Sequence, residues 1–154
     1  GRQDATPKTG AQEPFDLCKL NARGFIGVRS RDGQRNGYGV VRGKDGTIYA
    51  GQWSQDRRDG NGALMFGGGV FEGQWVQGQV HGKGVVRFKN GDTFQGSYKQ
   101  NQKHGQGTYT WADGAREVGV YVDGKKHGWH SWRYNEEAWD LLYEHGSVVT
   151  AEAV

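Results

Sequence analysis

Aromatic residues, glycines and polar residues alternate in short segments along most of the chain. In residues 49–53, Tyr49 and Trp53 flank Gly51, and small or polar residues stand between them. Residues 82–88 show the same alternation, with glycine, valine and phenylalanine at every second position. Because successive side chains of a strand point to opposite faces of a sheet, alternation with period two predicts half-buried antiparallel strands.

The pattern repeats every 22 or 23 residues. The glycines before each first strand are Gly46, Gly69, Gly91 and Gly114, and those that open each second strand are Gly37, Gly60, Gly82, Gly105 and Gly128. An aromatic-x-Gly-x-aromatic motif recurs at steps of 22–24 residues, with weaker first and last copies, in residues 25–29, 49–53, 71–75, 94–98 and 117–121. Three series with one period predict about five structural repeats over residues 24–137.

Each repeat is predicted to be a β-hairpin, because strands of about five to seven residues leave no room for a helix between them. The pairs Asp45-Gly46 and Asn90-Gly91 are typical of two-residue type I′ turns. The second connection of each repeat, such as residues 55–59, is predicted to be a longer exposed loop.

Each motif glycine shares a predicted face with large aromatic side chains. A glycine weakens a strand unless another group fills the space that its missing side chain leaves. We therefore expect an aromatic ring of a neighbouring strand to cover each glycine, so that one sheet bends and its apolar face closes on itself. The predicted fold is all-β, an elongated single-layer antiparallel ladder of about five β-hairpin repeats.

The two ends of the chain lack the period. Residues 1–22 are polar and are predicted to form a flexible arm. Residues 23–137 form the predicted repeat array, and residues 138–154 form a C-terminal cap. For the cap, the pattern favours a short helix that begins near Asn135, and a degenerate sixth hairpin with Trp139 on its first strand is the alternative.

The composition argues against disorder and against a membrane-spanning helix. The 154 residues include 28 glycines, but also 6 Trp, 7 Tyr and 6 Phe, and disordered chains are poor in aromatics. No run of about 18 apolar residues is present, so we expect no transmembrane helix. The single cysteine, Cys18, cannot form an internal disulfide, so a reducing, cytoplasmic location is expected.

Catalytic, cofactor and metal sites are not indicated. No nucleophile with an adjacent base can be placed by spacing, so we expect no enzyme activity and no small-molecule substrate. The segment from Gly119 to Lys126 lacks the Ser or Thr of a phosphate-binding loop. His81, His104 and His127 recur two strands apart, about 9–10 Å, which is too far to share a metal ion. Each is expected instead to hold a loop by a hydrogen bond.

The net charge of +3 is low for a nucleic-acid-binding protein, and no nucleic-acid partner is expected.

Three consecutive repeats resemble the MORN (membrane occupation and recognition nexus) repeat; they read YAGQWSQDRRDGNGALMFGGG, FEGQWVQGQVHGKGVVRFKNG and FQGSYKQNQKHGQGTYTWADG. The resemblance covers about residues 25–137 and implies a curved ladder of hairpins without catalytic activity. It also implies protein scaffolding, attachment of cytoskeletal structures to membranes and binding of acidic phospholipids. Arg29 and Glu117 stand in place of motif aromatics, Asp59 in place of the motif histidine and His130 in place of a motif glycine. We expect a surface specific to this chain at these departures.

The leading hypothesis is a non-catalytic scaffold that binds a protein partner, which is a peptide, a helix or a second copy of the chain. A single-layer ribbon cannot bury all of its aromatics, and exposed aromatics beside arginine are common in interfaces. The groove residues expected to contact the partner are Tyr49, Trp53, Phe71, Trp75, Arg87, Phe94, Tyr98, Trp111, Tyr121 and Arg133.

The alternative hypothesis is peripheral attachment to an anionic membrane. Each Lys or Arg near such a surface contributes about 1 kcal/mol of attraction. The residues expected to contact lipid headgroups are Arg57, Arg58, Lys83, Lys103, Lys125 and Lys126. Either hypothesis places the chain in the cytoplasm, at the cytoskeleton or at the inner face of a membrane.

Overall fold

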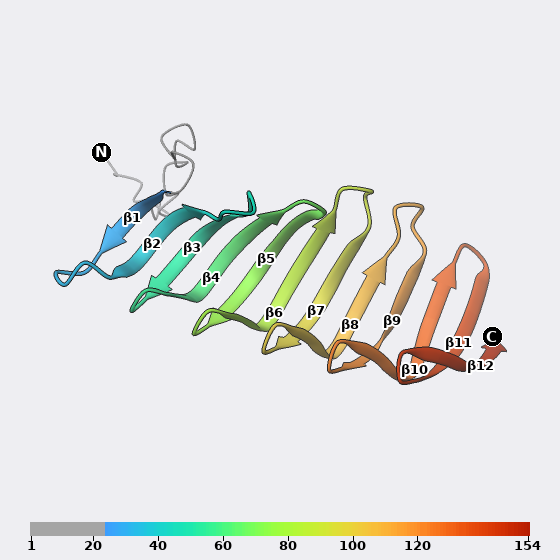
Figure 1. Ribbon diagram of the computed structural model, residues 1–154. Coiled ribbons are helices and arrows are strands. Elements are labelled where there is room, and N and C mark those ends of the chain that lie inside the picture. Colours follow the sequence, from blue (N-terminus) through green and yellow to red (C-terminus); the bar gives the residue numbers. More distant parts are fainter. Residues whose placement is uncertain (1–23) are drawn as a thin grey trace, which may run out of the picture.

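The computed structural model describes residues 24–154, and within this range the chain forms twelve β-strands and no helix. All twelve strands belong to one sheet whose spatial order is the chain order, β1 to β12 (Figure 1). Neighbouring strands are antiparallel, so the sheet is a succession of hairpins in a single layer. The predicted all-β, single-layer antiparallel ladder is confirmed. The arm predicted over residues 1–22 lies outside the described residues, as does Cys18.

The strands follow the repeat pattern closely. Their bounds are β1 Phe25–Arg29, β2 Arg35–Arg42, β3 Ile48–Ser54, β4 Arg57–Phe66, β5 Gly69–Val76, β6 Gln79–Phe88, β7 Thr93–Lys99, β8 Gln102–Thr110, β9 Arg116–Val122, β10 Lys125–Tyr134, β11 Glu137–Glu144 and β12 Ser147–Ala153.

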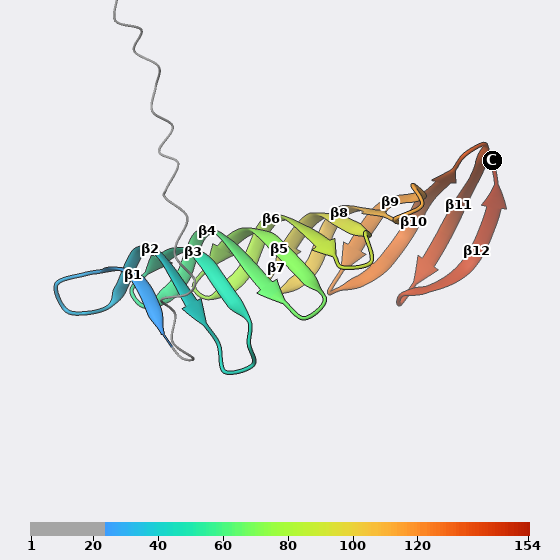
Figure 2. The ribbon, with the colours of Figure 1, turned by 90° about the horizontal axis from the view of Figure 1, so that it is seen from above.

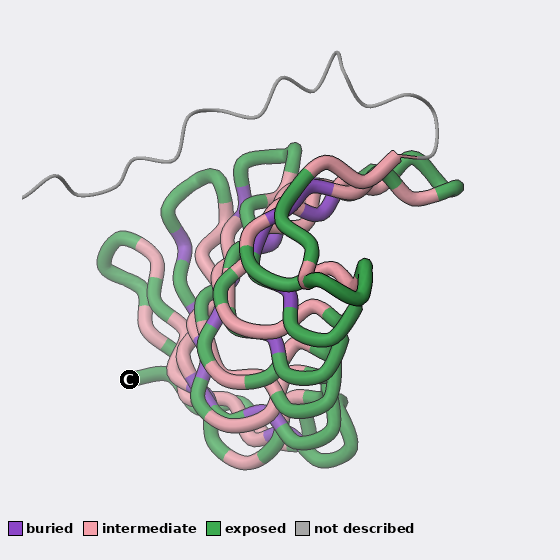
Figure 3. Tube along the Cα trace, turned by 90° about the vertical axis from the view of Figure 1, so that its left-hand side faces the viewer, coloured by how far each residue is buried: buried purple, intermediate pink, exposed green. Residues whose placement is uncertain are grey.

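The sheet twists along its length (Figure 2), and each hairpin curves so that the sheet partly encloses one of its own faces (Figure 3). The buried core on this face consists of Tyr49, Trp53, Phe71, Trp75, Val86, Phe94 and Tyr121. We call it the ring face, and we call the other side, which carries Gln52, Lys83 and Arg87, the opposite face. Because a single sheet has no second layer, the burial of these rings comes from the curvature of their own hairpins.

Aromatic rings cover the motif glycines of the next strand, as expected. A Cβ atom added to Gly62 would lie against the ring of Tyr49, and one added to Gly84 would lie against the ring of Phe71. Gly62 faces Gly51 across the β3–β4 pair, and both glycines contact the Tyr49 ring. The missing side chains therefore make room for the ring and let the two backbones bend around it.

The prediction of which connections are tight turns is wrong. The two-residue turns lie where longer loops were expected: Gln55 and Asp56 have φ values of 48° and 65°, the left-handed conformation that a type I′ turn requires at both positions. By contrast, residues 43–47 separate β2 from β3, and of the pair Asp45-Gly46 only Gly46 has a positive φ, at 84°.

The second strand of each repeat contains a β-bulge, and this bulge explains why the tight turns were assigned to the wrong connections. The partners of β3 shift from Gly62 opposite Gly51 to Arg58 opposite Trp53, so extra residues of β4 face Gln52. The Gln52 side chain accepts a hydrogen bond from the backbone N of Asn61 at 2.9 Å, which satisfies one donor of the bulged segment. The strand thus continues through residues whose composition suggested a loop.

The helix favoured for the C-terminal cap is also wrong, and the alternative, a degenerate sixth hairpin, is correct. β11 pairs with β10 through seven consecutive residue pairs, including Trp132 with Trp139, and β12 pairs with β11. Tyr143 of β11 is buried on the ring face at 7% exposure. A helix would have left the backbone N–H and C=O groups at the edge of β10 without partners, and a hairpin satisfies them.

Candidate functional site

Rings of successive strands contact each other in one unbroken series along the ring face. Neighbouring centroids in the series lie 4.9–6.0 Å apart, and the pairs are edge-to-face. Each such pair contributes about 0.5–1.5 kcal/mol beyond the burial of its apolar area. The series runs through Phe25, Trp53, Tyr49, Trp75, Phe71, Tyr98, Phe94, Tyr121, His130 and Tyr143.

The structure places most of the aromatic side chains expected to contact a partner inside this core. Those exposed by 6% or less are Tyr49, Trp53, Phe71, Trp75, Phe94 and Tyr121. Tyr98 and Trp111 are half-buried. Trp111 packs on Tyr109 with ring centroids 4.8 Å apart. Direct partner contact through these aromatics stays a prediction, and of the eight only Tyr98 and Trp111 lie partly at the surface.

The two predicted arginines lie on the opposite face. Arg87 alternates with the buried Val86, and its Nη1 lies 3.4 Å from Glu72 Oε2 with both side chains about 60% exposed. The Nη1 of Arg133 donates to the carbonyl oxygen of Trp132 at 2.8 Å and lies 3.4 Å from an oxygen of Asp140. Rings and arginines therefore do not line one common groove as predicted, because alternation along a strand sends them to different sides of the sheet.

A series of cations covers the outer edge of the ring face. The Cζ atom of Arg35 lies 4.2 Å from the ring centroid of Trp53, and that of Arg58 lies 4.8 Å from the ring centroid of Tyr49. The Nζ atom of Lys103 lies 4.1 Å from the ring centroid of Phe94. Lys126 lies 4.8 Å from the ring of Tyr143. A cation over a ring is attracted by the quadrupole of the ring. We call this set the cation series: Arg35, Arg58, Lys103 and Lys126, with Val80 at the equivalent place in β6.

Sequence reasoning missed the cation series, although its signal is present. Its positions are also 22 or 23 residues apart, like those of the glycines and aromatics. The tight turns fix the backbone of these residues: the amide of Gly78 donates to the carbonyl of Arg58 at 2.8 Å, and that of Gly124 to the carbonyl of Lys103 at 2.9 Å. Each turn is thereby stacked on the preceding repeat.

This arrangement divides the basic residues that were expected to contact lipid headgroups. Arg58, Lys103 and Lys126 fold over rings and are half-buried, whereas the exposed ones are Arg57, Lys83 and Lys125. Burial lowers the pKa of the Arg58 guanidinium and of the Lys103 ammonium, because both lose water. Burial alone would also lower the pKa of Lys126, but hydrogen bonds to Glu117 and Tyr143 outweigh it and the pKa is raised.

Of the three histidines at the repeat position, His81 and His127 form no hydrogen bond to a turn within the described residues, whereas His104 forms one, as the sequence predicted. The Nδ1 of His104 accepts a hydrogen bond from the amide of Asp123 at 3.3 Å, in the turn between β9 and β10. Asp59, which replaces the histidine in β4, accepts in the same way from the amide of Gln77 at 3.1 Å. Either side chain therefore tethers the turn of the following hairpin.

Charged groups occupy the core where β9 meets β10. Glu117 replaces the motif aromatic and is 3% exposed, and His130 replaces the motif glycine and is 2% exposed. The His130 ring covers Gly119, and its Nε2 lies 2.8 Å from the carbonyl oxygen of Val120. Glu117 lies 3.0 Å from His130 Nδ1 and 2.8 Å from Lys126 Nζ. The ring has thus moved from β9 to the place of a motif glycine in β10, and a carboxylate occupies the position that the ring has left in β9.

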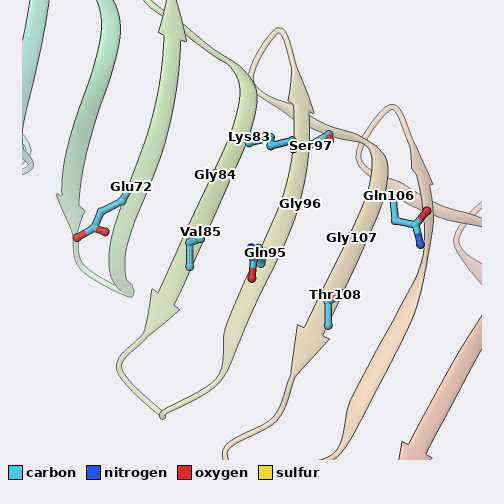
Figure 4. Close-up of a pocket in the computed structure, with 10 residues that line it drawn as sticks. All are labelled: Glu72, Lys83, Gly84, Val85, Gln95, Gly96, Ser97, Gln106, Gly107 and Thr108. Carbon is cyan, nitrogen blue, oxygen red and sulfur yellow. The ribbon is translucent and has the colours of Figure 1, made fainter.

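The surface of the sheet has several hollows, and among them are three at residues that the sequence selected. The central hollow, about 490 Å³ on the opposite face, is lined by glycines and mainly polar side chains of β5 to β8 (Figure 4). The Trp129 hollow, about 480 Å³ on the same face, includes Val118, Val120, Trp129, Arg133 and Asp140. The basic hollow, about 440 Å³ at the C-terminal end of the ring face, includes Lys103, Tyr109, Trp111, Tyr121, Lys125 and Lys126.

Neither a metal centre nor a spanning helix is found in the described part of the chain. Within residues 24–154, no three His, Cys, Asp or Glu side chains gather in a way that could hold a metal ion. The same residues contain no helix of the length and apolarity needed to cross a membrane.

The open sheet of stacked hairpins, with rings packed over glycines at a fixed period, defines a β-repeat protein. The chain belongs to the MORN-repeat family: the family profile matches residues 30–48, 49–69, 71–93 and 94–116. No curated protein sequence matches the chain significantly.

Among solved structures, the TCP domain of SAS-4 (dCPAP) of Drosophila melanogaster, in complex with a proline-rich motif of Ana2 (dSTIL), is 13% identical in sequence. The match covers 96% of this chain and 97% of that chain, with a TM-score of 0.32. A score of this size is too low to support an inference about function.

Proposed function

We propose that this protein is a non-catalytic MORN-repeat scaffold that binds a partner protein at a cytoplasmic structure of the cytoskeleton or the inner face of a membrane. Membership of the family supports the scaffold role. The open architecture supports it too, because no second layer within residues 24–154 covers the opposite face of the sheet.

The observation that carries the proposal is the Trp129 hollow. Trp129 is 51% exposed, and it stands at a strand position that polar residues such as Asn61 and Lys83 occupy in earlier repeats. Val120, 42% exposed, lines the same hollow together with Arg133. Exposed tryptophan and arginine around a depression are the usual chemistry of an interface hot spot, where single truncations cost about 2–4 kcal/mol.

The test is binding of a partner purified with the chain from its source cell and then measured with both components pure. Trp129→Ala should raise the dissociation constant at least about thirtyfold, because the ring is the main apolar anchor of the hollow. Trp139→Ala is the matched control, since Trp139 is 39% exposed and lies outside the hollow. Circular dichroism checks that both variants fold. Equal affinities for the wild type and Trp129→Ala would refute the proposal.

Attachment to an anionic membrane is the second candidate. The exposed side chains of Arg57, Lys83 and Lys125 favour it, but the half-buried cations lie over rings and do not project toward a flat surface. Sedimentation with phosphatidylserine vesicles decides it. Pelleting that requires the anionic lipid and declines with salt would support this role, and no pelleting would remove it.

A further inference from the structure

The basic hollow combines a strong positive charge with an apolar floor. Its lining contains three ammonium groups, from Lys103, Lys125 and Lys126, and no carboxylate. The remaining side chains that line it are the rings of Tyr109, Trp111 and Tyr121. A depression of about 440 Å³ accommodates a few side chains of a partner rather than a whole secondary-structure element.

Two of the three lysines have no acidic partner in the described part of the chain. Lys126 forms an ion pair with Glu117, whereas none of the ion pairs within residues 24–154 includes Lys103 or Lys125. Lys103 lies between two rings, 4.1 Å from the centroid of Phe94 and 5.4 Å from that of Tyr121. Burial lowers the pKa of Lys103, and repulsion from the like-charged Lys126 lowers it further. An anion in the hollow would favour the charged form of Lys103 and would thereby oppose both the burial and the repulsion from Lys126.

The fold holds these groups in place. The carbonyl of Lys103 accepts a hydrogen bond from the amide of Gly124, so the β9–β10 turn is fixed against β8. The aliphatic part of Lys125 lies close to Gly146 in the β11–β12 turn, where a Cβ atom would meet the lysine side chain at 3.6 Å. The hollow is thus bounded by three consecutive repeats and exists before any ligand arrives.

We propose that the basic hollow binds an acidic peptide segment of a partner protein, with carboxylates on Lys103 and Lys125 and an apolar side chain on the rings of Tyr109 and Trp111. This deepens the proposed scaffold function, on which it rests, by specifying the chemistry of the partner. The recessed position of Lys103 favours a peptide over a membrane, because a side chain can enter the hollow and a flat lipid surface cannot.

The probe is a fluorescein-labelled Glu-Glu-Phe-Glu-Glu peptide, with Gln-Gln-Phe-Gln-Gln as its uncharged counterpart, measured by fluorescence anisotropy. Saturable binding of the acidic peptide below about 1 mM is expected, and it should weaken as NaCl rises from about 50 to 300 mM. Lys103→Gln and Lys125→Gln should each weaken it about tenfold, and Lys99→Gln, an exposed lysine outside the hollow, should leave it unchanged.

Lys125→Gln keeps the test decisive even where Lys103→Gln lowers stability, since Lys125 is exposed and lies on none of the rings. The proposal is overturned by the absence of saturable binding, by equal binding of both peptides, or by unchanged affinity in both lysine variants. Vesicle pelleting that both lysine variants abolish, without peptide binding, would assign the hollow to lipid and equally overturn it.

Failure here is distinguishable from failure of the scaffold function. Trp129→Ala should not affect the acidic peptide, because Trp129 lies on the other side of the sheet. A partner captured through the Trp129 hollow but indifferent to Lys103→Gln and Lys125→Gln would refute the present inference alone. Acidic-peptide binding without any partner sensitive to Trp129→Ala would refute the Trp129 site and leave the basic hollow standing.

Discussion

The central hairpins, β3 to β8, and the C-terminal strands, β9 to β12, fill equivalent core positions with different chemistry. In the centre, the ring of Phe94 lies over Gly96 of its own strand and Gly107 of the next. In β9, the equivalent of Phe94 is Glu117, and the ring that covers the local glycine comes from His130 on β10. The hydrogen-bonded ladder continues across both regions.

This difference teaches that each repeat needs one ring in the space that its glycines leave, and that either strand can supply this ring. With the ring supplied by His130 of β10, position 117 of β9 holds a buried carboxylate in place of an aromatic. A buried carboxylate without a partner is costly, so Lys126 and His130 lie within 3.0 Å of it. In the central hairpins, by contrast, the positions equivalent to Glu117 and His130 hold the apolar ring of Phe94 and Gly107.

Truncating a central ring should have the largest effect. Phe71→Ala removes the side chain that covers Gly73 and Gly84, and it should lower the free energy of unfolding by about 4 kcal/mol. Urea denaturation followed by circular dichroism measures this. Val76→Ala, at a residue 47% exposed on the same strand, should change the value by less than about 0.5 kcal/mol. A loss below about 1 kcal/mol for Phe71→Ala would mean that the ring is not a core element.

Removing the buried charge of β9 should have the next largest effect. Glu117→Gln leaves the ammonium of Lys126 without its counter-charge and should cost about 3 kcal/mol of unfolding free energy. The same denaturation experiment measures it. An unchanged midpoint would show that the carboxylate is not required in the core.

The comparison can be tested directly by giving β9 and β10 the core residues of the central hairpins. The double substitution Glu117→Phe with His130→Gly recreates the arrangement of Phe94, Gly107 and Lys103. Its stability should lie within about 1.5 kcal/mol of the wild type, because a phenylalanine ring over glycines is the packing of the central hairpins. Glu117→Phe alone should be less stable than the double variant by about 2 kcal/mol, since the His130 ring already occupies the pocket.

The cation series should contribute less than either core. Arg58→Gln removes a guanidinium that lies 4.8 Å from the ring of Tyr49 and 5.2 Å from that of Trp75, and it should cost about 1 kcal/mol. Arg57→Gln is the control, because the adjacent Arg57 is exposed. Equal effects of the two substitutions on the denaturation midpoint would contradict a specific role of Arg58.

The smallest effect concerns Asp92, a buried carboxylate of the central region whose partners are neutral. The hydroxyl of Tyr109 and the amide of Ala112 donate to it, and these hydrogen bonds lower its pKa below 3.8. The folded state therefore favours the ionised form, so this stabilisation is present above the ordinary pKa and is lost as the pH falls through the lowered one. Tyr109→Phe should lower Tm at pH 7, and the difference from the wild type should shrink at pH 2. A difference independent of pH would rule out this linkage.

Several features could be predicted because they depend on one strand and its nearest neighbours. Alternation placed Tyr49, Gly51 and Trp53 on one face, and the period showed that a ring must lie over each glycine. Other features could not, because they depend on register. The bulge opposite Gln52 moved the tight turns to other connections, and a composition rich in charged and amide residues does not reveal whether a segment is a loop or a bulged strand.

The candidate site was predictable only in part. The sequence marked Glu117 and His130 as departures and selected Arg133 and Trp111, which now line hollows. It indicated that rings pack over glycines, but it did not show which of the selected rings stay partly at the surface. Nor did it indicate that Arg58 and Lys103 fold back onto rings, because the direction of a long side chain depends on which partner is within reach.

The sequence by itself therefore determined the period, the two faces of each strand and the pairing of rings with glycines, since these follow from the identity of residues at short, fixed spacings. Only the tertiary structure decided the turn types, the sixth hairpin, the transfer of the core ring from β9 to β10, and the placement of cations around the basic hollow. The physical reason is that these features arise from contacts between successive repeats, where register and curvature set which groups meet.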